Sequence, residues 1–142
     1  MEILYKSTRG NGETVTASQA ILKGLADDGG LFVPTQVPAL DVPMEKLAEM
    51  SYQEVAYEVM SRFFSDFTEE ELKHCINSAY DSKFDTKEIA PIREADGAFY
   101  LELFHGATIA FKDMALSILP HLMITSARKN QIKNDIVILT AT

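Results

Sequence analysis

The sequence predicts a mixed α/β protein with a helical N-terminal part that carries short strands and a C-terminal part that begins a parallel sheet. Three capping-box sequences, at 16–19, 51–54 and 68–71, each precede apolar residues at helical spacing. Residues 101–116 are expected to form a strand, a tight glycine-containing loop and a helix with an early lysine. The run at 136–139 (IVIL) is wholly apolar and mostly β-branched, which is typical of a strand buried on both faces.

Composition and charge restrict the possible functions. Of the 142 residues, 46% are hydrophobic and 24% are charged, which is normal for a globular protein. The net charge of −8 repels phosphate backbones, so no nucleic-acid partner is expected. A single cysteine, Cys75, cannot form an intrachain disulfide and fits a reducing compartment. Because no apolar run approaches membrane-spanning length and no signal-peptide pattern is present, we expect a soluble cytoplasmic protein without a membrane partner.

The first 50 residues are expected to contain short strands and two helices. Residues 3–6 alternate as a short strand would, and the capping box at Thr16 begins a helix that ends near Ala26 at the following Asp-Asp-Gly-Gly sequence. Residues 31–33 (LFV) indicate a short buried strand, and 44–50 a short helix. The predicted buried face of the first helix is Ala20, Ile21, Gly24 and Leu25.

Two longer helices follow the second and third capping boxes. Each carries one apolar face, which we interpret as core because amphipathic helices bury that face. His74 lies off the apolar face of its helix and is expected to be exposed. The predicted faces are Val55, Ala56, Val59, Met60, Phe63 and Phe64 in one helix, and Leu72, Cys75, Ile76, Ala79 and Tyr80 in the other.

A polar stretch at 81–88 predicts a boundary between two domains, 1–88 and 89–142. Asp96 and Gly97 form the pair favoured in a type I′ hairpin turn, so the chain should return as a strand over 99–104. The next helix is expected to begin at Thr108 as N-cap and to be kinked or divided by Pro120.

A strand, that helix and the run at 136–139 would make one βαβ unit of a parallel sheet. Two strands leave such a sheet incomplete, so we expect the chain to be an N-terminal piece of a longer protein. The exposed edge at 136–139 should then pair with a second chain, so the fragment is expected to self-associate.

Lys112 is the most informative single residue. Its neighbours Ile109, Phe111 and Met114 are apolar, and an adjacent helix N-terminus would add positive potential. Both effects favour the neutral amine, which a Schiff base to an aldehyde cofactor requires. A lysine in an apolar window can equally extend its ammonium group to solvent, and chemistry alone leaves both interpretations open.

The sequence HGATIAFKD at 105–113 resembles the pyridoxal-phosphate lysine segment of the threonine synthase family. The family pattern is a His-Gly-Pro-Thr loop followed by Ala-Phe-Lys-Asp, and this chain departs from it at Ala107, where proline is usual. GLADDGGLFVP at 24–34 resembles the N-terminal signature of the family, and ILTAT at 138–142 resembles the strand before its phosphate-binding loop. The matching loop residues are His105, Gly106, Thr108, Ala110, Phe111, Lys112 and Asp113.

The resemblance implies a pyridoxal-phosphate lyase of the tryptophan-synthase-β-like fold that converts O-phosphohomoserine and water to threonine and phosphate. Lys112 would be the catalytic and cofactor-bearing residue, with Phe111 and Asp113 at the cofactor and His105 and Thr108 near the substrate. No metal is implied. Two alternatives stay open, namely another lyase of the same fold, such as an amino-acid dehydratase, and a non-catalytic interaction module. The 142-residue piece alone is expected to be inactive.

Overall fold

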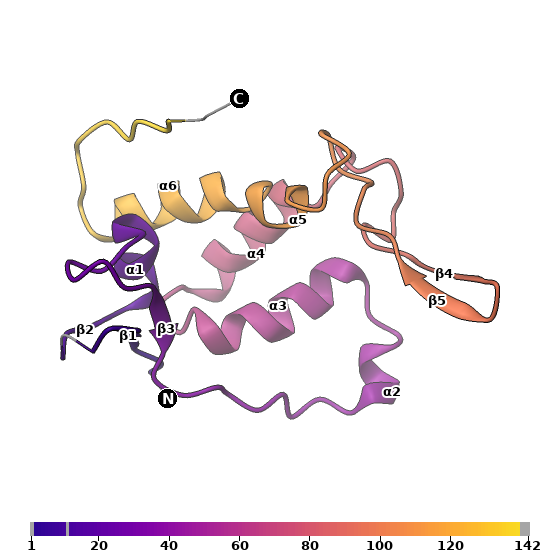
Figure 1. Cartoon of the computed structure of the whole chain (residues 1–142), viewed down its shortest axis with the longest axis horizontal. Helices are drawn as coiled ribbons and strands as arrows, with labels where there is room; N and C mark the ends of the chain where they lie inside the picture. Colours follow the sequence, from indigo (N-terminus) through magenta and orange to yellow (C-terminus); the bar gives the residue numbers. More distant parts are fainter. Residues whose placement is uncertain (1, 11, 140–142) are drawn as a thin grey trace.

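The computed structural model describes residues 2–10 and 12–139, and it is a mixed α/β structure, as predicted (Figure 1). One small antiparallel sheet has the strand order β2-β1-β3. Tyr5 lies opposite Val15 on one side and Pro34 on the other. The sheet consists of β1 (Tyr5–Ser7), β2 (Thr14–Val15) and β3 (Phe32–Pro34).

All three capping boxes form, so the predicted helix starts are confirmed for α1 (Ala17–Lys23), α3 (Tyr52–Phe63) and α4 (Glu69–Ala79). In α4, for example, the Glu71 amide donates to the Thr68 hydroxyl at 3.2 Å and the Thr68 amide donates to the Glu71 carboxylate at 2.9 Å. Helix α1 ends three residues before the predicted end, because Gly24 takes a φ of 70°. The short helix α2 (Met44–Leu47) precedes α3.

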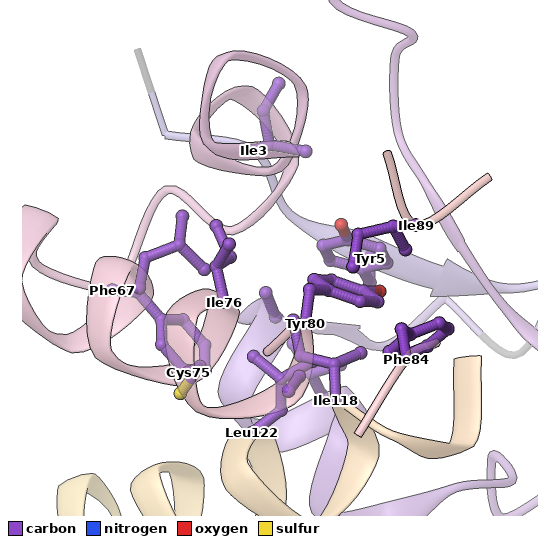
Figure 2. Packing of buried hydrophobic residues seen from close by; sticks show 14 residues of the cluster. Ile3, Tyr5, Phe67, Cys75, Ile76, Tyr80, Phe84, Ile89, Ile118 and Leu122 are labelled. Atoms are coloured by element: carbon purple, nitrogen blue, oxygen red, sulfur yellow. The ribbon is translucent and has the colours of Figure 1, made fainter. Parts of the chain in front are cut away.

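The core is centred on α4, whose predicted apolar face is fully buried (Figure 2). The prediction for α3 is only partly right, since none of its residues is fully buried and Val59 is 39% exposed. The predicted α1 face is also only partly right, because Ala20 and Ile21 pack against the core but Gly24 and Leu25 are exposed. The fully buried residues of α1 are Ala17 and Ser18. The buried cluster includes Ile3, Tyr5, Phe67, Leu72, Cys75, Ile76, Ala79, Tyr80, Phe84, Ile89, Ile118 and Leu122.

The predicted hairpin is confirmed as β4 (Ile92–Ala95) paired antiparallel with β5 (Ala98–Leu101). Asp96 and Gly97 have φ values of 51° and 73°, as a type I′ turn requires. β5 ends at Leu101 and does not extend to 104 as expected. The hairpin projects away from the helices, and all eight of its strand residues are exposed (Figure 1).

Pro120 divides the predicted long helix into α5 (Asp113–Leu116) and α6 (Leu119–Lys129). Proline is tolerated in the first turn of α6 because the backbone N–H groups there have no intrahelical acceptor. α6 packs against both α1 and α4. Its C-terminal end is held by the Asn130 side chain, which donates to the Ser126 carbonyl and to the Ser18 hydroxyl, both at 2.9 Å.

The predicted strand at 136–139 does not form, and the described residues contain no βαβ unit. All nine residues from 131 to 139 are exposed, and the segment leaves the helices after α6 (Figure 1). A strand needs a hydrogen-bonded neighbour, and no described strand lies beside this one. The last three residues of ILTAT, 140–142, lie outside the described residues. Within the described ranges, no helix combines the length and apolarity needed to cross a membrane.

Candidate functional site

The lysine loop, defined here as residues 105–112, joins the returning chain of the hairpin to α5. Lys112 immediately precedes α5 and forms part of the wall of an open hollow of about 790 Å³. The other lining side chains are almost all apolar and come from α3, the segment before β4, β5 and the residues after it, the lysine loop and α5. Tyr52, Leu101, Leu103, Phe111, Met114 and Leu116 are among them.

The predicted dry surroundings of Lys112 are not present in the described chain. Lys112 is exposed, and the neighbouring Phe111 side chain is 75% exposed. The predicted helix-dipole effect is also weak, because α5 has only four residues and no side-chain cap. Both physical arguments for a neutral amine therefore fail for these residues, because nothing in the described chain covers this face. Among residues 2–10 and 12–139, no hydrogen bond or ion pair engages the Lys112 amine.

The prediction that Thr108 caps a helix is wrong. Thr108 is bonded to Asp113 instead. Its backbone N–H donates to Asp113 Oδ2 at 2.7 Å, and its hydroxyl donates to Asp113 Oδ1 at 2.7 Å. Asp113 is 5% exposed. Both bonds stabilise the carboxylate and so lower the pKa of the Asp113 carboxyl below its ordinary value. The bond from the hydroxyl has the larger effect and the bond from the backbone N–H the smaller. Both oxygens of Asp113 are thus engaged within the lysine loop.

Gly106 allows this close approach. A Cβ atom at position 106 would lie 2.5 Å from the Asp113 Cβ and 2.7 Å from Asp113 Oδ2. Three residues further on, Ile109 has a φ of 59°, which is rare and strained for a β-branched side chain. Its amide donates to the Gly106 carbonyl at 3.0 Å. Such a conformation persists only where the surrounding contacts determine it.

His105 points to two carboxylates that sequence reasoning did not predict as its partners. Its Nδ1 is 2.5 Å from Asp85 Oδ1 and its Nε2 is 2.9 Å from Glu102 Oε2. The hydrogen bond with Glu102, followed by that with Asp85, raises the pKa of His105 above its ordinary value. The His105 carbonyl also accepts from the Asp85 amide at 3.1 Å. His105 therefore fastens the start of the lysine loop to the segment after α4. No local pattern identifies Asp85, which lies 20 residues away.

Tyr80 connects the core to the hollow, a role that its helical spacing alone did not predict. Its hydroxyl donates to the Met114 carbonyl in α5 at 2.7 Å. Its ring meets that of Tyr52 edge to face at a centroid distance of 4.9 Å, and Tyr52 lines the hollow. Burial raises the pKa of the Tyr80 hydroxyl, so it stays protonated and keeps donating.

The structure separates the five predicted site residues into three sets. Lys112 and Phe111 line the hollow. Thr108 and Asp113 bond each other, and His105 bonds Asp85 and Glu102. Within the described part of the chain, no cluster of three or more side chains could hold a metal ion.

The chain that carries this lysine loop is similar to known proteins in both sequence and fold. The family profile "Threonine synthase N terminus" matches residues 4–80. A threonine synthase of Schizosaccharomyces pombe is 42% identical over 125 residues, which is 85% of this chain and 24% of that protein.

Two solved structures agree with this chain in fold. Threonine synthase from Brucella melitensis with bound pyridoxal phosphate matches with a TM-score of 0.80 and 33% identity over 91% of this chain and 28% of that one. Yeast threonine synthase matches with a TM-score of 0.81 and 32% identity over 92% of this chain and 28% of that one. The chain belongs to the threonine synthase family. It spans about a quarter of the length of these relatives.

Proposed function

We propose that the protein to which this chain belongs is a threonine synthase, which converts O-phosphohomoserine and water to threonine and phosphate. The observation that carries the proposal is the family match over residues 4–80 together with the HGATIAFKD loop. Pyridoxal phosphate is the proposed cofactor, since a solved relative of the same fold holds it. The protein would thus act on a small molecule, in the cytoplasm.

The residues around the hollow fit this cofactor. The volume of about 790 Å³ lies in the usual range for small-molecule sites, and its apolar walls suit an aromatic ring. The Lys112 amine has no hydrogen-bond partner in the described chain that would compete for it. When bound, pyridoxal phosphate supplies an electron-withdrawing ring that stabilises negative charge on substrate carbons.

Within this proposal the residues of the chain bind, orient and move protons. Lys112 would hold the aldehyde carbon through Nζ and, once released, carry protons at that same atom. Phe111 would cover the ring and exclude water from the amine, provided that the uncovered face seen here is closed in the whole protein. The role of His105 is proposed to be that of fastening the loop near the substrate, through Asp85 and Glu102.

Two further properties of the chain are proposed. Residues 1–88 and 89–142 are proposed as parts of two domains, although the buried cluster includes Ile118 and Leu122 together with residues of the first part. The 142-residue piece alone is proposed to self-associate through its exposed apolar residues at 136–139, and to lack turnover.

Reductive trapping tests the function. The full-length protein is treated with pyridoxal phosphate and borohydride, and its labelled peptides are mapped; phosphate release from O-phosphohomoserine is assayed in parallel. We expect the label on Lys112, and Lys112→Ala should abolish turnover while thermal unfolding stays cooperative. Lys133→Ala, a change of another exposed lysine, is the matched control and should retain turnover. A label confined to other lysines, or near-normal threonine formation by Lys112→Ala, would overturn the proposal.

A further inference from the structure

We infer that Asp113 is a positioning residue, whose carboxylate closes residues 108–113 into a hydrogen-bonded ring and thereby sets where Lys112 lies at the hollow. The inference rests on the proposed function in one respect only, namely that Lys112 is the residue that carries the cofactor. It assigns to Asp113 and Thr108 a different role from contact with cofactor and substrate. The resemblance alone had implied those contacts.

The closing bonds join Thr108, in the middle of the lysine loop, to Asp113, directly after Lys112. Thr108 presents both its N–H and its hydroxyl, each at 2.7 Å from a different oxygen of Asp113. Hydrogen bonds to a carboxylate are about twice as strong as those between neutral groups. Because Lys112 is bonded covalently to Asp113, any movement of that carboxylate moves the lysine backbone as well.

Burial and strain show that the ring determines the loop conformation. The Asp113 side chain is buried against Gly106, where any larger residue would collide with it. Ile109, between the two closing residues, keeps a left-handed φ of 59° although its side chain is exposed and gains no packing there. A strained exposed residue needs an external constraint, and the Thr108–Asp113 pair spans it on both sides.

The engagement of both Asp113 oxygens also limits what else this residue can do. Each oxygen already accepts one strong bond from Thr108, and Asp113 does not line the hollow that Lys112 and Phe111 share. The Thr108 hydroxyl donates its single proton to Asp113, so it has none left to donate to a substrate. A positioning role uses all of these contacts, whereas donation by the Thr108 hydroxyl to a substrate would require its bond to Asp113 to break.

The test compares the full-length protein with Asp113→Asn, Thr108→Val and Thr108→Ser. Hydrogen exchange of the peptide covering 106–112 reports on the loop without any cofactor. We expect Asp113→Asn and Thr108→Val each to speed exchange there by about tenfold or more, while Thr108→Ser, which keeps the hydroxyl, stays within about twofold of the natural protein. The double variant Asp113→Asn/Thr108→Val should exchange no faster than Asp113→Asn alone, because the single and the double variant remove the same interaction.

Two further measurements separate positioning from general destabilisation. Asp81→Asn removes an exposed carboxylate that also accepts a local backbone N–H, from Lys83 at 2.9 Å, and serves as the matched control. In the loaded enzyme, Asp113→Asn should lower kcat with little change of KM, and Asp81→Asn should change neither.

The outcomes are distinguishable. Unchanged exchange at 106–112 in Asp113→Asn and Thr108→Val would overturn the inference whatever the cofactor does. The exchange could be faster in the two variants as expected while Lys112 of the natural protein takes no label on reduction. That result would support the ring and reject the proposed function. If Asp113→Asn fails to fold, the contrast between Thr108→Val and Thr108→Ser decides, and equal exchange in those two variants would reject the inference.

Discussion

Replacing Tyr80 by phenylalanine is expected to destabilise the chain although the substitution leaves its core ring in place. The Tyr80 side chain is buried, and its hydroxyl donates to the Met114 carbonyl at 2.7 Å. Removal of the oxygen creates no sizeable cavity, so the cost is that of the hydrogen bond. A net bond contributes about 1 kcal/mol, and a buried acceptor left unpaired costs about 1–3 kcal/mol. Because Met114 keeps partial access to solvent, we expect a loss of about 1–2 kcal/mol.

Urea unfolding followed by circular dichroism measures this loss. The midpoint should fall while the slope m stays constant, because the surface exposed on unfolding is unchanged. Tyr100→Phe is the matched control, since Tyr100 lies exposed on β5; it should change stability by no more than about 0.5 kcal/mol. Equal midpoints for the two variants would refute the reasoning that Tyr80 ties α4 to α5 through its hydroxyl.

Three other predictions concern the pH dependence, the core and the C-terminal segment. The raised folded-state pKa of His105 means that its contribution to stability is complete below about pH 6.5 and is lost as the pH rises through the folded value. The difference in unfolding midpoint between the natural chain and His105→Gln should therefore shrink between pH 6 and pH 9, and a constant difference would contradict this. Leu72→Ala should lower the free energy of unfolding in urea by about 2–5 kcal/mol because Leu72 is 1% exposed, and Phe63→Ala should lower it less because that ring is only partly buried. The reverse order would show that α3 and not α4 supplies the main core face. In light scattering on the 142-residue chain, Val137→Lys should lower the average mass, because a charge opposes association of the exposed apolar segment; an unchanged mass would place the contact elsewhere.

Local sequence was enough where the structure depends on neighbours within a few residues. The capping boxes at Thr16, Ser51 and Thr68 each use one side chain and one amide three residues apart, so the sequence alone located all three helix starts. The Asp96-Gly97 turn was predicted for the same reason, because its left-handed φ values depend on those two residues. The apolar neighbours of Lys112 drew attention to that residue, and the family resemblance gave its loop a function.

Tertiary structure decided the features that depend on residues distant in sequence. His105 acquires Asp85 as a partner only because the chain folds back after α4. The apolar face of α3 packs on α4 but stays partly exposed in the described chain, which its helical spacing could not show. The segment at 136–139 has the residues of a buried strand, yet it forms none without a neighbouring strand to complete its hydrogen bonds. A buried strand needs its backbone N–H and C=O groups paired, and pairing between distant segments is a property of the folded chain that no stretch of sequence carries by itself.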